Sequence, residues 1–171
     1  MKVKDITTNA ILLAIAIVLS IVEGFIPSIG VPGVKFGLAN IVILITLYAY
    51  GWHYALAVNL LRVFLVSLLR GTIFQIGFFM SLTGALFSLA IMIFCKLVIK
   101  KLNIITVSVL GAFAHVVGQI LVAVIYLETT GMFFYLPILT ITSVATGIIV
   151  GFIANRCLKI PIFHASVKTN Q

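Results

Sequence analysis

Long apolar runs without any charged side chain occur five times along the chain. Each run holds 16 to 27 residues free of Asp, Glu, Lys and Arg, and the runs are Thr7–Val22, Phe36–Leu61, Gly71–Cys95, Leu102–Leu127 and Thr129–Asn155. A membrane-spanning helix needs about 20 consecutive apolar residues. The pattern therefore predicts at least five transmembrane helices.

The second run continues past Arg62 to Leu69, which is too long for one span. A helix-breaking glycine and aromatic side chains that favour a membrane interface divide it at residues 50–53, Tyr-Gly-Trp-His. We therefore predict an all-α integral membrane bundle of six transmembrane helices in one domain, residues 1–171. The predicted helices are Thr7–Ile26, Gly37–Tyr50, Tyr54–Arg70, Gln75–Val98, Ile105–Tyr126 and Phe134–Asn155.

The distribution of basic residues supports six spans with both termini in the cytoplasm. This topology places only Lys35 and Arg70 outside and leaves Arg62 within a span. Residues 156–171 form a cytoplasmic tail, and the inner side receives eight basic residues, namely Lys2, Lys4, Lys96, Lys100, Lys101, Arg156, Lys159 and Lys168. Cytoplasmic loops of membrane proteins carry such an excess. An undivided second run would put Lys96, Lys100 and Lys101 outside.

Composition places the chain in a lipid bilayer. Of its 171 residues, 63% are hydrophobic and 8% are charged, and the mean hydropathy is +1.35. The net charge of +8 is explained by topology signals, so we expect no nucleic-acid binding. The length leaves no room for a soluble catalytic domain.

Polar residues gather in the outer half of the predicted bundle, which suggests a pocket open to the outside. Ionisable groups inside a membrane cost about 2.5–3.5 kcal/mol each on insertion scales, so each needs a partner or a function. The candidate substrate-binding residues are Glu23, Lys35, Asn40, Asn59, Arg62, His115 and Gln119. Structural alternatives stay open for several of them. Arg62 could pair with Glu23, His115 with Gln119 could clamp two helices, and Lys35 could anchor the interface.

Small residues at four-residue spacing predict close helix packing, because helices in lipid associate through backbone approach. In the fourth and sixth helices we interpret these positions as internal contacts: Gly77, Ser81, Ala85 and Ser88, and Ser143, Gly147, Gly151 and Asn155. In the first helix, Ala10 and Ala14 could instead seat a helix of another subunit.

Signatures of catalysis are missing from the sequence. It contains no G-x-x-x-x-G-K-[ST], H-E-x-x-H or G-x-S-x-G motif. Asp5, Glu23 and Glu128 are the only carboxylates, too few and too scattered for the magnesium site that diphosphate chemistry needs. We therefore expect no enzyme activity, no metal site and no cofactor, and any ATP must be hydrolysed by another protein.

The segment at residues 32–41, Pro-Gly-Val-Lys-Phe-Gly-Leu-Ala-Asn-Ile, resembles the P-G-x-K-x-G-L-A-N signature of a prokaryotic membrane family. This family is called heptaprenyl diphosphate synthase component I, or the Gx transporter family. Further matching motifs are Leu60-Leu61-Arg62, Ser81-Leu82-Thr83-Gly84, residues 111–119 and residues 134–137. The family commonly has Asn and Gly where this chain has Val116 and Ala85.

The resemblance implies a fold similar to the substrate-binding S components of energy-coupling factor (ECF) transporters. Such subunits capture a vitamin or precursor outside the cell and dock on a transmembrane coupling subunit with two cytoplasmic ATPases. An alanine-rich face on the first helix meets the coupling subunit in that group, and Ala10, Ala14 and Ala16 fit it here. The family label suggests an isoprenoid or quinone connection.

We therefore expect a substrate-capture subunit in a prokaryotic cell membrane, with a small anionic or zwitterionic ligand such as a vitamin or an isoprenoid or quinone-related precursor. One alternative is a non-catalytic membrane subunit that assists a soluble prenyl diphosphate synthase through the basic inner rim. Another is a carrier that works alone. The capture hypothesis requires the outer polar residues to surround a void.

Overall fold

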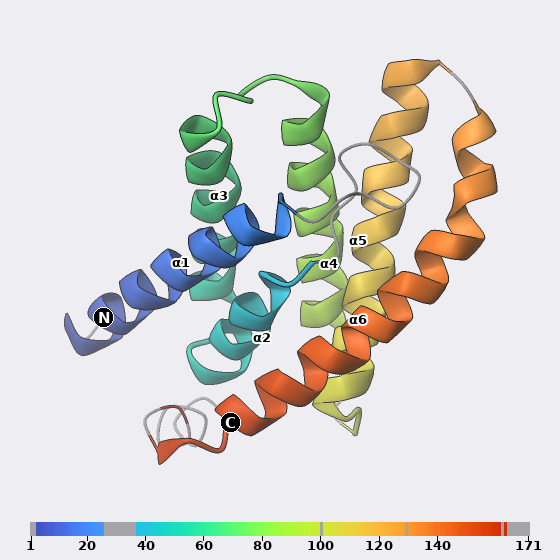
Figure 1. The fold of residues 1–171 in the computed structure, drawn as a ribbon. Coiled ribbons are helices and arrows are strands. Elements are labelled where there is room, and N and C mark those ends of the chain that lie inside the picture. The colour runs from blue at the N-terminus through green and yellow to red at the C-terminus, as the bar shows by residue number, and fades with distance from the viewer. Residues whose placement is uncertain (1–2, 26–36, 100, 129, 162, 164–171) are drawn as a thin grey trace.

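The computed structural model describes residues 3–25, 37–99, 101–128, 130–161 and 163. These residues fold into six α-helices and one short 3-10 helix, in an all-helical bundle (Figure 1). The elements are α1 (Val3–Glu23), α2 (Asn40–Ala49), α3 (Trp52–Leu69), α4 (Ile76–Val98), α5 (Ile104–Leu127), η1 (Thr130–Tyr135) and α6 (Leu136–Cys157).

Every helix predicted from the apolar runs corresponds to a helix in the structure. Within the described residues, the predicted and observed ends of each helix differ by at most four residues. The largest difference is at the first helix, which begins at Val3 rather than Thr7. Asp5 lies in its first turn, where a negative charge interacts favourably with the helix dipole. A search for charge-free residues therefore starts this helix too late. The predicted end at Ile26 lies outside the described residues.

Five of the helices are long and apolar enough to cross a membrane, and the chain is a multi-pass membrane protein. The exception is α2, whose 10 residues extend only about 15 Å at 1.5 Å per residue. Six helices are thus present in the described residues, but α2 alone reaches about half-way through a hydrocarbon core of about 30 Å.

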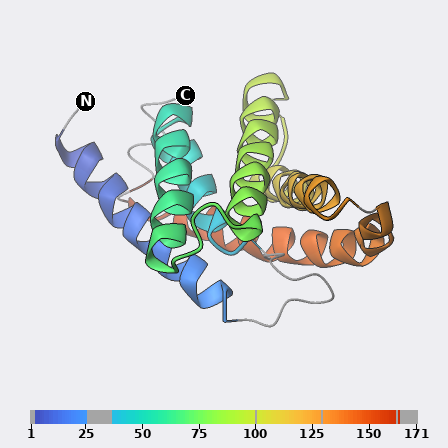
Figure 2. The same cartoon turned by 90° about the horizontal axis from the view of Figure 1, so that it is seen from above.

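In Figure 1 the helices α3, α4 and α5 run up and down, while α1 and α6 cross the bundle obliquely. Seen from above, α5 is viewed nearly end-on, and α3 and α4 lie at an angle to it (Figure 2). Between these helices lies α2, which contacts α1, α3 and α6. Its apolar side chains, from Val42 to Leu47, form the centre of the core. The short helix is therefore surrounded by protein.

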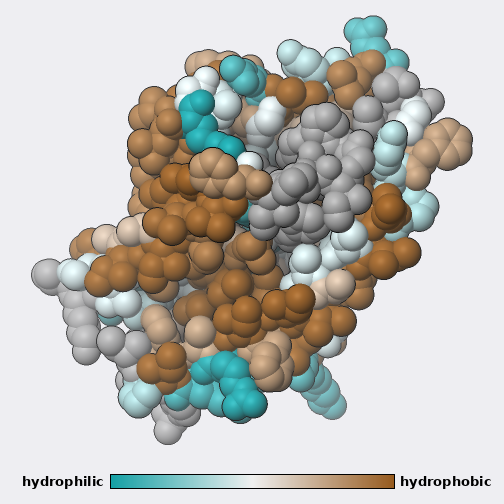
Figure 3. Space-filling model, viewed as in Figure 1, coloured by the Kyte–Doolittle hydropathy of each residue, from teal (hydrophilic) through white to brown (hydrophobic). Residues whose placement is uncertain are grey.

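The outer surface of the bundle is largely hydrophobic, as Figure 3 shows for one face. Large apolar side chains stand exposed on α1, α3, α4, α5 and α6, among them Ile11, Phe64, Phe94, Ile125 and Ile141. Exposed apolar belts of this extent are expected where lipid replaces water.

Glycines bring α4, α5 and α6 into backbone contact. A Cβ atom added to Gly118 of α5 would lie 2.9 Å from the Thr83 carbonyl oxygen and 3.0 Å from Gly84 Cα in α4. On α6, a Cβ at Gly147 or Gly151 would lie 2.8 or 2.7 Å from a Cα atom of α5. This confirms internal packing for Gly147 and Gly151 of the sixth helix, and Ser143 is buried as well, whereas Asn155 is half-buried.

The small residues of α4 were also predicted to be internal packing contacts, and this holds for all but one of them. Its Ser81, Ala85 and Ser88 are buried, whereas a Cβ atom at Gly77 would meet nothing within 4 Å. The closest backbone approach of α4 is instead at Gly84, which the four-residue pattern had not included.

Candidate functional site

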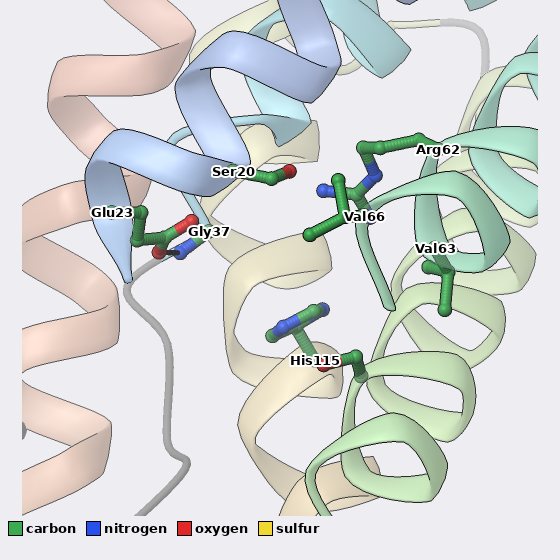
Figure 4. Close-up of a pocket in the computed structure, with 8 residues that line it drawn as sticks. Ser20, Glu23, Gly37, Arg62, Val63, Val66 and His115 are labelled. Atoms are coloured by element: carbon green, nitrogen blue, oxygen red, sulfur yellow. Dashed lines mark hydrogen bonds between the residues drawn. The ribbon is translucent and has the colours of Figure 1, made fainter. Parts of the chain in front are cut away.

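A cavity lies among α1, α3, α4, α5 and the residues just before α2. It is lined by Ser20, Glu23, Gly37, Arg62, Val63, Val66, Ser81 and His115. Figure 4 shows these side chains converging from separate helices, with the Arg62 guanidinium and the His115 ring directed into the common space. Opposite charges, Glu23 and Arg62, therefore line one void inside an apolar bundle.

Glu23 holds the chain just before α2. The residue is buried, at the end of α1, and its Oε1 atom accepts hydrogen bonds from the backbone N–H groups of Gly37 and Leu38. Gly37 has φ +83°, a conformation that strains any residue with a side chain. The carboxylate thereby fixes the start of α2 next to the cavity.

Arg62 is positioned by its own helix and by α4. Its Nη2 atom donates a 2.9 Å hydrogen bond to Asn59 Oδ1, one turn earlier on α3. Asn59 in turn donates from Nδ2 to the Ala85 carbonyl oxygen on α4, also at 2.9 Å. Arg62 Nε is buried and has no hydrogen-bond partner among the described residues. The guanidinium therefore keeps donor capacity for another acceptor.

His115 and Gln119 lie one turn apart on α5, beside the close contact with α4. A Cβ atom at Gly84 would meet the His115 carbonyl oxygen at 2.9 Å and the Gln119 side chain at 3.0 Å. Gln119 is fully buried, and within the described part of the chain neither polar atom of its amide has a hydrogen-bond partner. A buried unpaired amide costs about 1–3 kcal/mol, so this position needs an explanation other than local stability.

The structure brings together only some of the residues predicted to bind a substrate, and the binding role stays a prediction for all of them. Glu23, Arg62 and His115 line the cavity, whereas Asn59 and Gln119 are buried outside its lining. Asn40 is also buried outside the lining, and its Nδ2 atom donates to Ser88 Oγ at 3.4 Å. Lys35 lies outside the described residues.

Five lining residues were not predicted as ligand contacts, namely Ser20, Gly37, Val63, Val66 and Ser81. Ser20 lies one turn before Glu23 on α1, so the prediction of Glu23 as a site residue could have been extended to Ser20. Ser81 was counted only as a packing residue, and its hydroxyl donates to the Gly77 carbonyl oxygen at 2.7 Å. Small polar residues give a weak sequence signal, because they serve packing and binding equally well.

The cavity is narrow. The empty space at its lining residues measures about 340 Å³ when the part open to solvent is included, but only about 20 Å³ of it can hold the centre of a water-sized molecule. Holding one water takes about 10–15 Å³ on this measure. The site is thus built around a water-sized space, and a larger ligand requires its walls to move apart.

The alanines of α1 separate into two environments. Ala10 and Ala14 are exposed on the bundle surface, while Ala16 is fully buried in the core. The exposed alanine face therefore consists of Ala10 and Ala14, with exposed Ile11 and Ile15 beside it.

No group of three or more His, Cys, Asp or Glu side chains suited to a metal occurs in the described part of the chain. The polar groups at the cavity are one carboxylate, one guanidinium, one imidazole and two hydroxyls. This set can hold a small polar ligand by hydrogen bonds and charge.

Comparison with known proteins gives one match. The family model described as heptaprenyl diphosphate synthase component I matches residues 12–157. No curated protein and no solved structure matches the chain.

Proposed function

The chain belongs to the heptaprenyl diphosphate synthase component I family, and from that premise we propose that it is the substrate-binding membrane subunit of an uptake transporter. In this role it resembles an ECF S component and captures a small anionic or zwitterionic compound from outside the cell. The supporting observation is that Glu23, Arg62 and His115, from three different helices, line one buried void.

The chemistry of the void favours a ligand that accepts hydrogen bonds from a cation. Arg62 retains an Nε donor without a partner among the described residues, and planar guanidinium groups bind carboxylate or phosphate in fixed geometry. Glu23 is already engaged with backbone N–H groups before α2, so it offers less to a ligand. Since the space has room for only about one water molecule, the ligand-bound form must be wider than this one.

Energy for uptake would come from partners, since the sequence contains no P-loop. We propose a transmembrane coupling subunit and two cytoplasmic ATPases as these partners, with the exposed face at Ala10 and Ala14 as the contact. Small side chains there would admit a close helix.

Affinity purification from native membranes tests the partner proposal. The wild-type chain should bring down a membrane subunit and ATPases, and Ala14→Leu should lose them. Ala90→Leu is the matched control, because Ala90 is also exposed but lies on α4. Recovery of the same partners with Ala14→Leu would contradict the contact, and recovery of no ATPase would contradict the transport role.

Native mass spectrometry tests the site itself. We expect a small molecule to remain bound to the wild-type chain and to be absent from Arg62→Ala. Arg156→Ala is the control, since Arg156 lies at the opposite end of the bundle near Phe152. Circular dichroism must show that both variants remain helical. Equal retention in Arg62→Ala would refute the site.

A second candidate function follows from the family description, which names a component of a synthase. Here the chain would recruit a soluble prenyl diphosphate synthase to the membrane through its basic inner rim, which includes Lys101, Arg156 and Lys159. Recovery of a soluble synthase instead of ATPases in the same purification would favour it.

A further inference from the structure

A second cavity opens at the other end of the bundle, where α2 ends, α3 begins and α4 ends. It is lined by Leu47, Tyr50, Gly51, Trp52, His53, Ile93, Lys96 and Leu97. About 270 Å³ of it is open to the centre of a water-sized molecule, against about 20 Å³ in the first cavity. This is ample room for a small polar group.

Lys96 supplies a charge in this cavity. Its Nζ atom donates a 2.7 Å hydrogen bond to the Leu47 carbonyl oxygen and lies 5.1 Å from the centre of the Tyr48 ring. These contacts fix the ammonium at the end of α2. An ammonium has three donor hydrogens, and the described hydrogen bond uses one of them.

The other lining groups also suit an anion. The rings of Trp52 and His53 are stacked with their centres 3.5 Å apart, and both side chains are exposed. No side chain caps α3, which begins at Trp52. The region thus combines a fixed cation, an imidazole and an indole N–H donor, without any carboxylate in the lining.

The mouth of the cavity adjoins the lipid-facing surface. Leu97 lines the cavity and is 58% exposed, next to the exposed Val98 and Phe94 on α4. Trp and Tyr side chains concentrate where hydrocarbon meets head groups, and Trp52, Tyr50 and Tyr54 lie at this end. A molecule held at Lys96 could therefore extend a hydrocarbon chain along α4.

We propose that this cavity binds the phosphate group of an amphiphile with net negative charge, with the phosphate at Lys96 and His53 and the hydrocarbon chain against Leu97. Two sources supply such a phosphate group. One is an anionic phospholipid of the bilayer, which carries a hydrocarbon chain, and the other is free phosphate, which does not. Basic pockets between membrane helices commonly bind lipid head groups. The site is independent of the outer cavity, so it stands whether or not the transport role does.

The purified full chain in zwitterionic phosphatidylcholine nanodiscs, with and without added phosphatidylglycerol, provides the test. We expect phosphatidylglycerol to raise the melting temperature of the wild-type chain and to stay bound in native mass spectrometry. Lys96→Met should lower the retained phosphatidylglycerol at least tenfold. Lys101→Met is the control, because Lys101 is exposed near the same end and does not line the cavity.

Two further variants separate binding from folding. Lys96→Arg keeps the cation and should retain phosphatidylglycerol, whereas Ile93→Trp fills the cavity, keeps Lys96 and should lose it. Stabilisation by inorganic phosphate alone, equal to that by phosphatidylglycerol, would assign the site to a soluble phosphate. Equal retention of phosphatidylglycerol and phosphatidylcholine, or full retention by both Lys96→Met and Ile93→Trp, would overturn the proposal.

Discussion

Replacing Gly151 by alanine tests the backbone contact that joins α5 and α6. The added Cβ would lie 2.7 Å from Ile105 Cα and 2.9 Å from Ser108 Cβ. Ordinary van der Waals contact begins at about 3.4 Å, so the distance of 2.7 Å between the added Cβ and Ile105 Cα is about 0.7 Å too short. The two helices must therefore separate locally by about that distance. Overpacking of a well-packed interior costs about 1–3 kcal/mol.

The matched control is Gly77→Ala on α4, where the new methyl group would meet nothing within 4 Å. The gain in helix propensity of alanine over glycine, about 1 kcal/mol in water, applies to helix interiors such as Gly151, whereas Gly77 lies in the first turn of α4. Because this gain works against the packing cost at Gly151, lower stability of Gly151→Ala than of Gly77→Ala reports overpacking. We expect Gly151→Ala to be less stable than Gly77→Ala by about 1–3 kcal/mol.

Unfolding in mixed micelles, followed by circular dichroism as sodium dodecyl sulfate is titrated, measures this difference. Gly151→Leu should be more destabilising still, because its side chain meets the same backbone with three more carbon atoms. If Gly151→Ala and Gly77→Ala unfold at the same denaturant fraction, the close approach of α5 and α6 is wrong.

Three other substitutions probe buried polar residues in or near the first cavity, namely Asn59, Gln119 and Glu23. Asn59→Ala removes the α3–α4 hydrogen bond and the acceptor for Arg62 and should cost about 1–3 kcal/mol in the same unfolding titration; wild-type stability would contradict this bridge. Gln119→Leu removes a buried amide without described partners, so we expect unchanged or higher stability, and a clear loss would show that the amide is satisfied. Glu23→Ala should speed hydrogen exchange at the Gly37 and Leu38 amides, measured by mass spectrometry; unchanged exchange would contradict that anchor.

The fold was largely predictable because membrane helices leave a simple signal. A span must satisfy its backbone internally and present apolar side chains to lipid, so charge-free runs mark it in the sequence. The division at Gly51 was predicted from the helix-breaking glycine and the aromatic residues around it, and Gly51 indeed has φ +96°. The number of residues in α2 was harder to predict, because its burial by protein removes the length requirement of a bilayer.

The sequence indicated the region of the first cavity but not its lining. Costly polar groups pointed to Glu23, Arg62 and His115, and these line one cavity. The pattern could not tell that Asn59 serves as a bridge between α3 and α4, because an asparagine that binds a helix and one that binds a ligand look alike in sequence. The second cavity, at Lys96, was missed because Trp52 and His53 were interpreted only as an interface turn.

The shortness of α2 has a consequence for how the protein is made. A helix of ten residues is about half of what the insertion machinery accepts as a span, and its neighbours in the finished bundle include α6, which follows it by more than eighty residues in the chain. We expect α2 to enter the membrane only with later helices, so that nascent chains ending near residue 75 leave it outside the bilayer. Glycosylation acceptors placed beside Tyr50 would report its location at each chain length.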